Sequence, residues 1–430
     1  MKFYIYTLGC KVNQYESEAI SEIFVKNGYV ASENSNEADI IIINSCSVTA
    51  ESDRKARQAV RRFRKNSPNA VIALCGCYPE GNPTEAKKLL EADIIMGNGR
   101  KNGIFEKIVD YIDNKKRNDE FETLGNAVEF ESMTVTSAGN RLRAAVKIED
   151  GCNSFCSYCI IPYVRGRVRS KPEFEAIEEI RKLAESGIKE IVLSGIHLDR
   201  YGTENNESDL TSLLEKLDRL KCDFRIRLSS LDPVYITEET VKRLSVLKKL
   251  CPHFHLSLQS GSDSVLRAMN RKYTSAQYKN AVSIIKRYLP EASVTTDIIT
   301  GFPGETEKDF EDSVNIVKNC EFLKVHVFPY SERPGTRAAE MKNSIPKELR
   351  SKRANILIRK ADEVSQGYLS RYIGKEAEVL VEEIKNGTAY GYTKNYIYTS
   401  FSAENVSEGD IVAVTLQKLN GDSVLAALCK

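Results

Sequence analysis

The sequence predicts an α/β protein in three parts: an N-terminal α/β domain with a parallel sheet, a central partial (β/α)6 barrel, and a small antiparallel C-terminal β-barrel. Three observations support this prediction. Apolar runs alternate with helical stretches in the first hundred residues, six β/α units follow residue 144, and short strands separated by Asn-Gly and Gly-Asp turns follow residue 371. We place the domains at residues 1–115, 141–370 and 371–430, with a polar linker or edge segment at 116–140.

The composition is typical of a globular protein. The 430 residues are 41% hydrophobic and 28% charged, with a net charge of +2. No apolar run approaches the roughly 18 residues of a membrane span, so we expect a cytoplasmic protein without a membrane partner. Contacts with nucleic acid must then come from local basic patches. An odd number of cysteines, 11 in all and partly clustered, suits metal ligands and buried thiols better than a disulfide framework.

The N-terminal domain places a cysteine after each of its expected strands. We expect strands at 2–8, 39–44 and 70–74 and helices at 16–27 and 53–65. Cys10 follows the first strand, Cys46 the second, and Cys75 and Cys77 the third. Because the carboxyl ends of parallel strands meet at one edge of a sheet, three cysteines can converge there as a second ligand set. Each alone is more simply a small hydrophobic residue that caps a strand.

Two details refine this second set. Cys77 lies in a Gly-Cys-Tyr-Pro turn and is favoured as the third ligand, whereas Cys75, at a strand end, is expected to be buried. The helix expected at 53–65 carries seven positive charges between Arg54 and Lys65. That run is a candidate for phosphate contacts, although most charge runs on helices are simply solvated faces.

The central barrel carries the most specific motif, Cys152-x3-Cys156-x2-Cys159. It follows the first of six expected strands, at the end where β/α barrels carry their active sites. Three thiolates suit an iron-sulfur cluster and leave one of four irons open. The expected strands are 144–149, 190–194, 224–229, 254–258, 293–299 and 324–328, with helices at 173–186, 274–288 and 307–318.

The C-terminal part begins after a long basic helix expected at 347–372. Four strands are expected in the small barrel, at 377–382, 388–392, 395–401 and 411–418. Tyr390, Tyr392, Tyr396 and Tyr398 offer stacking surfaces for bases, and strand alternation predicts that half of them are core. From Arg371 onward, six Lys or Arg face eight Asp or Glu, so this barrel is poorly suited to RNA as a whole. The helix at 54–65 and the cluster Arg165, Arg167, Arg169 and Lys171 are expected to carry more of the phosphate binding.

Together these features resemble a known family. The Cys152-x3-Cys156-x2-Cys159 motif on the first loop of a six-unit barrel resembles the radical S-adenosylmethionine superfamily. The three-cysteine N-terminal domain and a C-terminal barrel similar to a TRAM domain narrow the resemblance to methylthiotransferases. The branch acting on N6-threonylcarbamoyladenosine in tRNA is most similar, through Thr7-Leu-Gly-Cys-Lys-Val-Asn-Gln-Tyr-Glu-Ser-Glu18, Gly151-Cys-Asn-Ser-Phe-Cys-Ser-Tyr-Cys-Ile-Ile-Pro-Tyr-Val-Arg-Gly-Arg167, Arg267-Ala-Met-Asn-Arg-Lys-Tyr273 and Asp297-Ile-Ile-Thr-Gly-Phe-Pro-Gly-Glu-Thr306. The resemblance covers essentially the full length.

The resemblance implies a chemistry. Cys152, Cys156 and Cys159 would hold a 4Fe-4S cluster whose open iron binds S-adenosylmethionine, and one electron would cleave it to the 5′-deoxyadenosyl radical. That radical would remove hydrogen from carbon 2 of the target adenine next to the anticodon. Cys10, Cys46 and Cys77 would hold a second 4Fe-4S cluster that presents or donates sulfur, and a second S-adenosylmethionine would supply the methyl group. The implied partners are a tRNA anticodon stem-loop, an electron donor such as a flavodoxin or ferredoxin, and a sulfur donor.

The residues that bind S-adenosylmethionine are predicted less specifically than the cluster ligands. Tyr158 and the backbone near Ile160 would border the adenine of S-adenosylmethionine. Five residues at carboxyl ends of strands could bind its methionine and ribose groups: Ser194, Gly195, Ser257, Gln259 and Asp297. Strand termination and capping are equally good explanations for them. His253, His255 and His326 are expected to be packed structural residues, and the role of His197 stays open.

Two other functions remain open at the level of sequence. A sister methylthiotransferase would act on isopentenyladenosine in tRNA or on an aspartate of a ribosomal protein, but the sequence around Cys10 argues against both. A non-catalytic iron-sulfur protein that binds RNA or senses a signal belongs to a different class.

Overall fold

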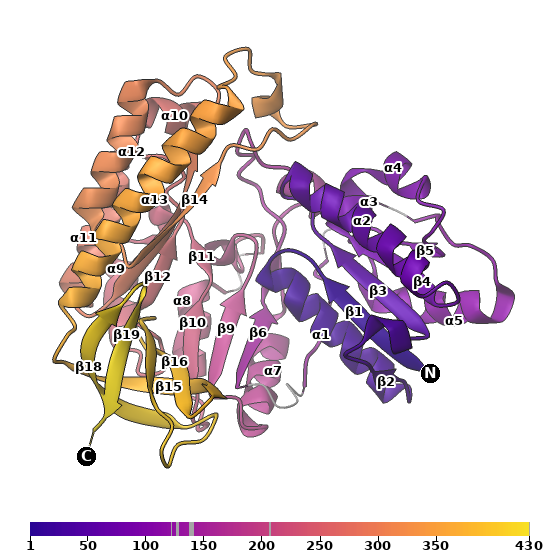
Figure 1. The fold of residues 1–430 in the computed structure, drawn as a ribbon, viewed down its shortest axis with the longest axis horizontal. Coiled ribbons are helices and arrows are strands. Elements are labelled where there is room, and N and C mark those ends of the chain that lie inside the picture. Colours follow the sequence, from indigo (N-terminus) through magenta and orange to yellow (C-terminus); the bar gives the residue numbers. More distant parts are fainter. Residues whose placement is uncertain (122, 126–128, 137–141, 206–207, 430) are drawn as a thin grey trace.

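The computed structural model describes the whole chain except residues 122, 126–128, 137–141, 206–207 and 430. Figure 1 shows three parts: an N-terminal α/β domain on one side, a curved central sheet wrapped by helices, and a small C-terminal barrel against one end of that sheet. The predicted fold class is confirmed. Within the described residues, no helix combines the length and the apolar character needed to cross a bilayer.

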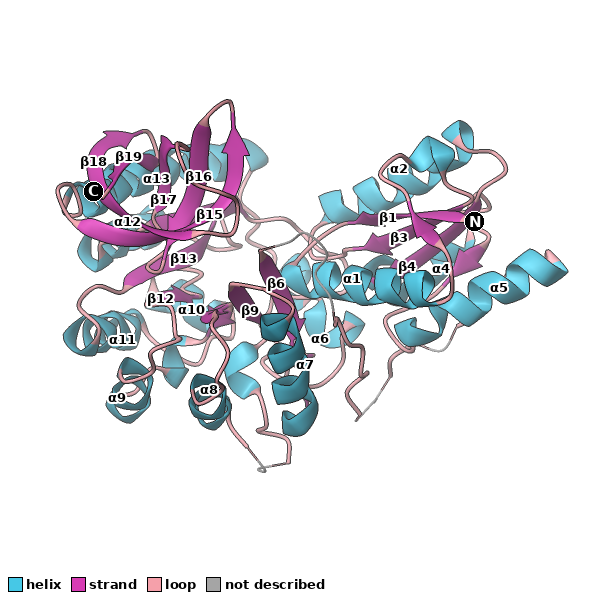
Figure 2. Cartoon of the chain, turned by 90° about the horizontal axis from the view of Figure 1, so that it is seen from below, coloured by secondary structure: helices cyan, strands magenta, loops and turns pink. Residues whose placement is uncertain are grey.

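The N-terminal domain is built on a parallel sheet in the order β2-β1-β3-β4-β5. Its strands are β1 (Lys2–Thr7), β2 (Val30–Ala31), β3 (Ile40–Ser45), β4 (Val71–Gly76) and β5 (Ile94–Ile95). Helices α1 (Lys11–Lys26) and α5 (Ile104–Asn114) cover one face, and α2 (Ala50–Asn66) covers the other (Figure 2). The short helices α3 (Cys77–Gly81) and α4 (Pro83–Lys87) follow β4.

Strand β3 shows why this domain has three layers, with the sheet between two layers of helices. Ile42 packs into the core that contains Phe24 of α1, and Ile43 packs into the core that contains Phe63 of α2. Successive side chains of a strand point to opposite faces, so an unbroken apolar run needs a helix on both. The core on the α1 side continues into the central barrel, and the two domains therefore share one interior.

Helix α1 begins at Lys11, earlier than the predicted start at residue 16. Cys10 is its N-cap residue, and Val12 and Tyr15 are buried in its first turns. The two apolar residues of this stretch, Val12 and Tyr15, are separated by polar ones, which is a weak helical pattern. Contacts made in the folded chain, with the barrel as well as the sheet, override that weak local pattern.

The central sheet is a half-open barrel of parallel strands. One part has the order β10-β9-β6 and the other β11-β12-β13-β14. The parts are joined because β10 and β11 are separated only by Ser229, so the same length of chain pairs first with β9 and then with β12. The strands are β6 (Arg143–Lys147), β9 (Glu190–Ser194), β10 (Arg225–Leu228), β11 (Ser230–Leu231), β12 (His253–Leu256), β13 (Ser293–Thr300) and β14 (Lys324–Pro329).

Helices cover the outer face of this barrel. The larger ones are α7 (Glu173–Glu185), α8 (Leu210–Asp218), α9 (Glu238–Ser245), α11 (Ser275–Tyr288), α12 (Glu307–Cys320) and α13 (Lys347–Ser370). Two short helices, α6 (Ile161–Val164) and α10 (Asp263–Ala268), and a two-stranded ribbon of β7 (Glu149–Asp150) and β8 (Arg169–Ser170) frame the cysteine motif. Single 3-10 turns lie at Ser35–Glu37, Lys101–Gly103, Leu198–Arg200, Pro233–Tyr235 and Arg337–Glu340.

The segment between the first two domains carries no helix or strand among its described residues from 116 to 142. It is nevertheless packed. Met133 and Val135 are buried, and the Met133 carbonyl accepts hydrogen bonds from Tyr15 and Lys171. This part of the chain therefore holds α1 against the barrel.

The C-terminal domain is a closed barrel in the order β15-β16-β17-β19-β18. Its strands are β15 (Glu376–Lys385), β16 (Thr388–Thr393), β17 (Tyr398–Ser402), β18 (Ile411–Asn420) and β19 (Ser423–Leu428), the last of which the sequence analysis missed. The barrel sits at the amino ends of the central strands. Arg225 and Ser293, the first residues of β10 and β13, bond to the backbone carbonyls of Tyr392 and Asn395.

The four tyrosines of this barrel do not divide into core and surface as predicted. All four are half-buried, and Tyr392 lies 4.6 Å from Tyr396 and 4.9 Å from Tyr398 between ring centroids. Residues two apart along a strand share a face, and the antiparallel pairing sets Tyr392 opposite Tyr398. The prediction that half of these tyrosines are buried in the core was therefore wrong. The four rings form one stacked group instead.

Candidate active site with two cysteine centres

The loop that carries Cys152, Cys156 and Cys159 is fixed from two sides. The Ser157 amide donates to the Met269 carbonyl just after α10 at 3.0 Å, and the Ser157 carbonyl accepts from the Ala338 amide after β14 at 2.8 Å. Asn270 Nδ2 donates to the Phe155 carbonyl at 3.0 Å. Contacts from distant parts of the barrel thus hold the loop in place before any ligand binds.

Hydrogen-bond donors point at two of these sulfurs. Arg271 Nη1 lies 3.3 Å from Cys156 Sγ, and the Ser154 amide lies 3.4 Å from Cys152 Sγ. Burial raises the pKa of Cys159 to about 12, so that thiol stays protonated unless a metal cation displaces the proton. Three convergent thiols with N–H donors around them fit an iron-sulfur cluster, whose sulfurs accept such bonds.

The second set of cysteines meets at the carboxyl edge of the N-terminal sheet, as predicted. Cys10 caps α1, Cys46 follows β3, and Cys77 is the first residue of α3. Cys10 is open to a cavity and Cys46 is buried, but the surrounding protein desolvates both thiols and raises the pKa of each, and the neighbouring Cys77 thiol adds to both shifts. Cys75 lies inside β4, is fully buried and is held at a pKa of about 12 by that burial. The structure therefore groups the three cysteines that the sequence selected.

Gly9 permits this approach. Its φ is +106°, and a Cβ at this position would lie 2.8 Å from Cys46 Cβ and 3.0 Å from Cys46 Sγ. A side chain here would displace the Cys46 sulfur. The space between Gly9 and Cys46 is therefore too small for even one added carbon atom.

Replacing Gly9 by alanine is expected to lower the iron content of the reconstituted protein if Cys10, Cys46 and Cys77 are ligands, because the added methyl group collides with Cys46 and disfavours the backbone conformation. Gly28→Ala is the matched control, since Gly28 also has a positive φ of +82° but has nothing within 4 Å of the added carbon. Iron content after anaerobic reconstitution measures both. Equal iron in the two variants would contradict this role of Gly9.

Arg165 lies beside the second centre. It is 1% exposed, and its Nη1 donates to Glu16 at 2.9 Å and to Asp150 at 3.1 Å. Its positive charge acts on the thiols of Cys10 and Cys77. Within the described part of the chain, its buried Nε has no hydrogen-bond partner. A buried donor left unpaired beside thiols fits a sulfur acceptor on a bound cluster.

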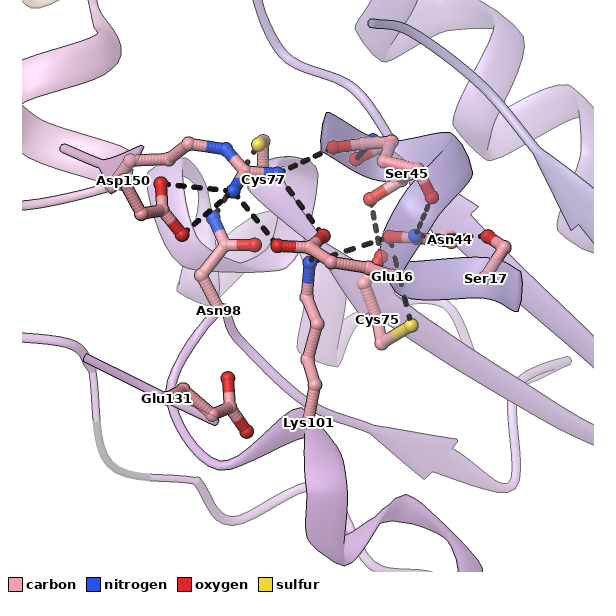
Figure 3. A network of polar contacts seen from close by, with 12 residues as sticks. Glu16, Ser17, Asn44, Ser45, Cys75, Cys77, Asn98, Lys101, Glu131 and Asp150 are labelled. Carbon is pink, nitrogen blue, oxygen red and sulfur yellow. Dashed lines mark hydrogen bonds and ion pairs between the residues drawn. The ribbon is translucent and has the colours of Figure 1, made fainter. Parts of the chain in front are cut away.

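Arg165 lies among other buried charged groups. Figure 3 shows Glu16, Lys101 and Asp150 gathered close to Cys77 and Asn98. Burial alone would raise the pKa of Glu16, but Arg165, Lys101 and Lys147 outweigh it and hold that pKa well below its ordinary value. Glu16 of α1 and Lys101 belong to the N-terminal domain, whereas Lys147 of β6, Asp150 of β7 and Arg165 after α6 belong to the barrel, so the network fixes how the two domains meet.

One short segment borders both centres. Ile160, next to Cys159, packs with Val164 and with Cys77 of the N-terminal domain. Asn98 Nδ2 donates to Cys77 Sγ at 3.4 Å and to the Val164 carbonyl at 2.6 Å. Residues 160–165 therefore separate the two cysteine sets and contact the second directly.

A cavity of ≈ 710 Å³ opens inside the half-barrel and reaches the second centre. All three domains line it. Cys10 and Lys11 come from the N-terminal domain, Ser194, Gly195 and Asp297 from the barrel strands, and Tyr392, Tyr396 and Tyr398 from the C-terminal barrel.

Comparisons with known proteins agree along the whole chain. Residues 146–317 match the radical SAM superfamily, residues 2–97 the uncharacterized protein family UPF0004, and residues 370–428 the TRAM domain. The threonylcarbamoyladenosine tRNA methylthiotransferase of Bacillus subtilis is 38% identical over 423 residues, covering 96% of this chain and 93% of the relative. Its counterpart from Thermotoga maritima is 39% identical over 426 residues, covering 98% and 96%. The chain belongs to the radical S-adenosylmethionine methylthiotransferase family.

The methylthiotransferase is also similar to other proteins. A tRNA-2-methylthio-N(6)-dimethylallyladenosine synthase of Pelotomaculum thermopropionicum is 36% identical, covering 96% of this chain and 95% of the relative. Among solved structures, the radical S-adenosylmethionine methyltransferase TsrM of Kitasatospora setae shares the fold, with a TM-score of 0.57 and 12% identity over 78% of this chain and 76% of that chain. Family membership makes the protein an enzyme and implies one 4Fe-4S cluster and S-adenosylmethionine.

The residues predicted for the cofactor of this methylthiotransferase fall into three groups. Ser194, Gly195 and Asp297 line the cavity. Tyr158 packs in an apolar cluster with Phe302 and Tyr330, while Ile160 faces Cys77. The Ser257 carbonyl accepts from Arg271 at 3.4 Å, and Gln259, with φ of +67°, bridges to β13. The last group lies on the side of Cys156.

The four histidines lie in different environments. His253 is buried, stacks on Tyr396 at 4.5 Å and bonds to Thr295, which fits the predicted structural role. His255 and His326 instead converge with Asp297 at the cavity, each offering a ligand atom within 4.8 Å of the others. His197 Nδ1 lies 3.7 Å from Cys152 Sγ.

Several residues at the site carry no signal that a single sequence displays. Glu149 is fully buried, and burial raises its pKa well above the ordinary value. Its Oε2 accepts from the His197 amide at 2.7 Å, while Oε1 has no hydrogen-bond partner among the described residues. Asn98 likewise reaches Cys77 from a distant part of the chain. Arg165 and Arg271 stood within quoted family motifs, which did not reveal the contacts that they make.

The basic cluster after the cysteine motif was misjudged. Arg165, Arg169 and Lys171 are at most 4% exposed and are held by Asp150 and Glu179. They cannot reach phosphates. Of the four predicted cations, Arg167 alone is exposed.

Proposed function

We propose that this enzyme methylthiolates carbon 2 of N6-threonylcarbamoyladenosine next to the anticodon of tRNA. The observation that carries this proposal is the shared border of the two cysteine sets, where residues 160–165 follow Cys159 and contact Cys77. A site that must both activate a carbon and deliver sulfur needs two such centres within reach of one substrate. Relatives named for this nucleoside match over nearly the full length.

In this proposal Cys152, Cys156 and Cys159 hold a 4Fe-4S cluster. When bound, the cluster supplies the electron that cleaves S-adenosylmethionine to a 5′-deoxyadenosyl radical. The polar residues Ser194, Gly195, Ser257, Gln259 and Asp297 bind the cofactor's methionine and ribose groups, and Tyr158 with the backbone at Ile160 borders its adenine. Packing of the three domains around the cavity excludes water from the reacting carbon.

Cys10, Cys46 and Cys77 hold a second 4Fe-4S cluster that presents the sulfur, and a second S-adenosylmethionine provides the methyl group. Arg165 and Asn98 donate hydrogen bonds toward the second centre and keep it oriented. An electron donor such as a flavodoxin or ferredoxin and a sulfur donor complete the reaction in the cytoplasm.

The tRNA is held by the exposed face of α2. Lys55, Arg62 and Lys65 are exposed there, and Lys55 and Lys65 make no ion pair with the described residues, whereas Arg54 is paired with Glu51 and Arg61 with Glu91 at 3.6 Å. Unpaired cations are free to displace counterions from phosphates.

Replacing Lys55 and Lys65 together by alanine is expected to weaken tRNA binding, and to lower the slope of log affinity against log salt concentration by about 1 per lysine. Arg54→Ala with Arg61→Ala removes the same charge from the same helix but from paired groups, and a smaller effect is expected. Filter binding over a salt series measures both. Equal slopes in the wild type and the lysine variant would mean that tRNA does not bind to this face of α2.

The alternative substrate is isopentenyladenosine, because a relative named for dimethylallyladenosine is 36% identical. Mass spectrometry of tRNA nucleosides from a strain that lacks the gene distinguishes the two. Loss of the 2-methylthio form of threonylcarbamoyladenosine is expected. Unchanged levels of that form, in a strain without a second such enzyme, would contradict the proposed substrate.

A further inference from the structure

Lys11 occupies an unusual place in the molecule. It is the first residue of α1 and follows Cys10 directly. Its side chain is exposed, but to the interior: it lines the ≈ 710 Å³ cavity of the half-barrel and a second cavity of ≈ 1070 Å³ between α1 and strand β6. A cation at the first turn of a helix faces the positive end of the helix dipole, so the fold gains nothing from a lysine here.

Other cations at this cavity already have partners. Arg227 Nε and Nη2 lie 2.9 and 2.8 Å from the Glu190 carboxylate, and its Nη1 donates to the Lys394 carbonyl at 3.1 Å. Lys324 is paired with Asp422 at 3.3 Å. These side chains are occupied by the protein's own anions and carbonyls.

Lys11 has no such partner. No hydrogen bond or ion pair joins it to any of the residues that the structure describes. Burial and the nearby guanidinium groups of Arg143 and Arg227 lower the pKa of Lys11 to about 8, and the carboxylates of Glu190 and Glu382 oppose this only in part. Both carboxylates are paired with Arg143, Glu190 at 2.6 Å and Glu382 at 3.1 Å. The Lys11 amino group therefore faces the cavity without a hydrogen-bonding or ion-pair partner among the described residues.

We propose that Lys11 binds the terminal carboxylate of the threonylcarbamoyl group and so selects the substrate. This inference rests on the proposed function. The threonylcarbamoyl group ends in a carboxylate and a hydroxyl, whereas the isopentenyl group is wholly apolar. A site built around a charged hydrogen bond rejects an analogue that lacks the charge, because the buried partner is then left unpaired. The cation beside Cys10 places this selection at the sulfur-delivering centre.

Binding of modified anticodon stem-loops tests the inference without turnover. Fluorescence anisotropy is measured on the reconstituted protein with loops that carry threonylcarbamoyladenosine, its carboxylate methyl ester, or unmodified adenosine. Wild type is expected to bind the free acid roughly 10- to 100-fold more tightly than the ester, since a hydrogen bond to a charged group is lost. Lys11→Gln should bind the acid and the ester equally, and Lys11→Arg should keep most of the difference.

The control is Lys324→Gln, which removes a cation from the same cavity that is already paired with Asp422. It is expected to preserve the preference for the acid. Wild type that does not distinguish acid from ester would overturn the inference, as would a Lys11→Gln variant that still does. If Lys11 instead reads a backbone phosphate, Lys11→Gln weakens all three loops equally, and if it reads the carboxylate of S-adenosylmethionine, it weakens cofactor binding in equilibrium dialysis. Either pattern overturns the inference too.

The proposed function can fail separately. If wild type binds or discriminates the loops but mass spectrometry finds no methylthio product on threonylcarbamoyladenosine, the substrate assignment is wrong. If wild type makes the product but treats acid and ester alike, only the role of Lys11 is wrong.

Discussion

Replacing Cys10, Cys46 and Cys77 together by alanine is expected to abolish methylthiolation while S-adenosylmethionine is still cleaved to 5′-deoxyadenosine. The barrel cysteines and their donors, Arg271 and the Ser154 amide, are untouched by this change. About four irons per chain should remain of about eight. Iron analysis, together with chromatography of 5′-deoxyadenosine and of tRNA nucleosides, measures the three quantities on one sample.

The reciprocal variant, with Cys152, Cys156 and Cys159 replaced by alanine, should also retain about four irons but form neither product. Cys75→Ala is the control, because it removes a buried thiol that stands outside both sets. No iron left in the barrel-cysteine variant would mean that only one cluster exists. Methylthiolated tRNA from the N-terminal variant would mean that these cysteines do not deliver sulfur.

The second large effect is expected at Arg165, and it concerns stability. Arg165→Met leaves the carboxylates of Glu16 and Asp150 buried with less positive charge, although Lys101 and Lys147 remain near them. Breaking a buried ion pair by removing one partner costs about 3–5 kcal/mol. The thermal unfolding transition followed by circular dichroism should therefore fall by several degrees.

Arg167→Met is the matched control for this prediction. Arg167 stands two residues away in the same loop, but its side chain is exposed and lies over Phe155. Little change in the unfolding midpoint is expected. Equal midpoints for the two variants would show that the buried network does not hold the domains together.

The fold was predictable because its elements are strongly patterned. The buried strands β3 and β9 appear as unbroken apolar runs, and the parallel arrangement follows from their alternation with helices. The same reasoning brought Cys10, Cys46 and Cys77 to one edge, since that placement depends only on where strands end. It also favoured Cys77 over Cys75 by expecting a turn at Cys77, but that residue begins helix α3 and is 3% exposed, so both thiols are buried.

The rest of the site depends on contacts between distant residues. Arg165 meets Glu16 across 149 positions of sequence, and no local pattern distinguishes its guanidinium from the exposed one of Arg167. The stacked tyrosines were missed for a simpler reason, since residues two apart in a strand share a face. Lys11 stood within the quoted motif from Thr7 to Glu18 but was not singled out, because an unpaired cation is recognised only when its surroundings are known.

The most direct test of the account is the fate of the hydrogen at carbon 2 of the target adenine. An anticodon stem-loop carrying threonylcarbamoyladenosine with deuterium at that carbon is incubated with the reconstituted enzyme, reductant and S-adenosylmethionine, and 5′-deoxyadenosine is analysed by mass spectrometry. We expect one deuterium in 5′-deoxyadenosine, in an amount matched by the methylthio product. Product formed together with unlabelled 5′-deoxyadenosine would contradict this expectation.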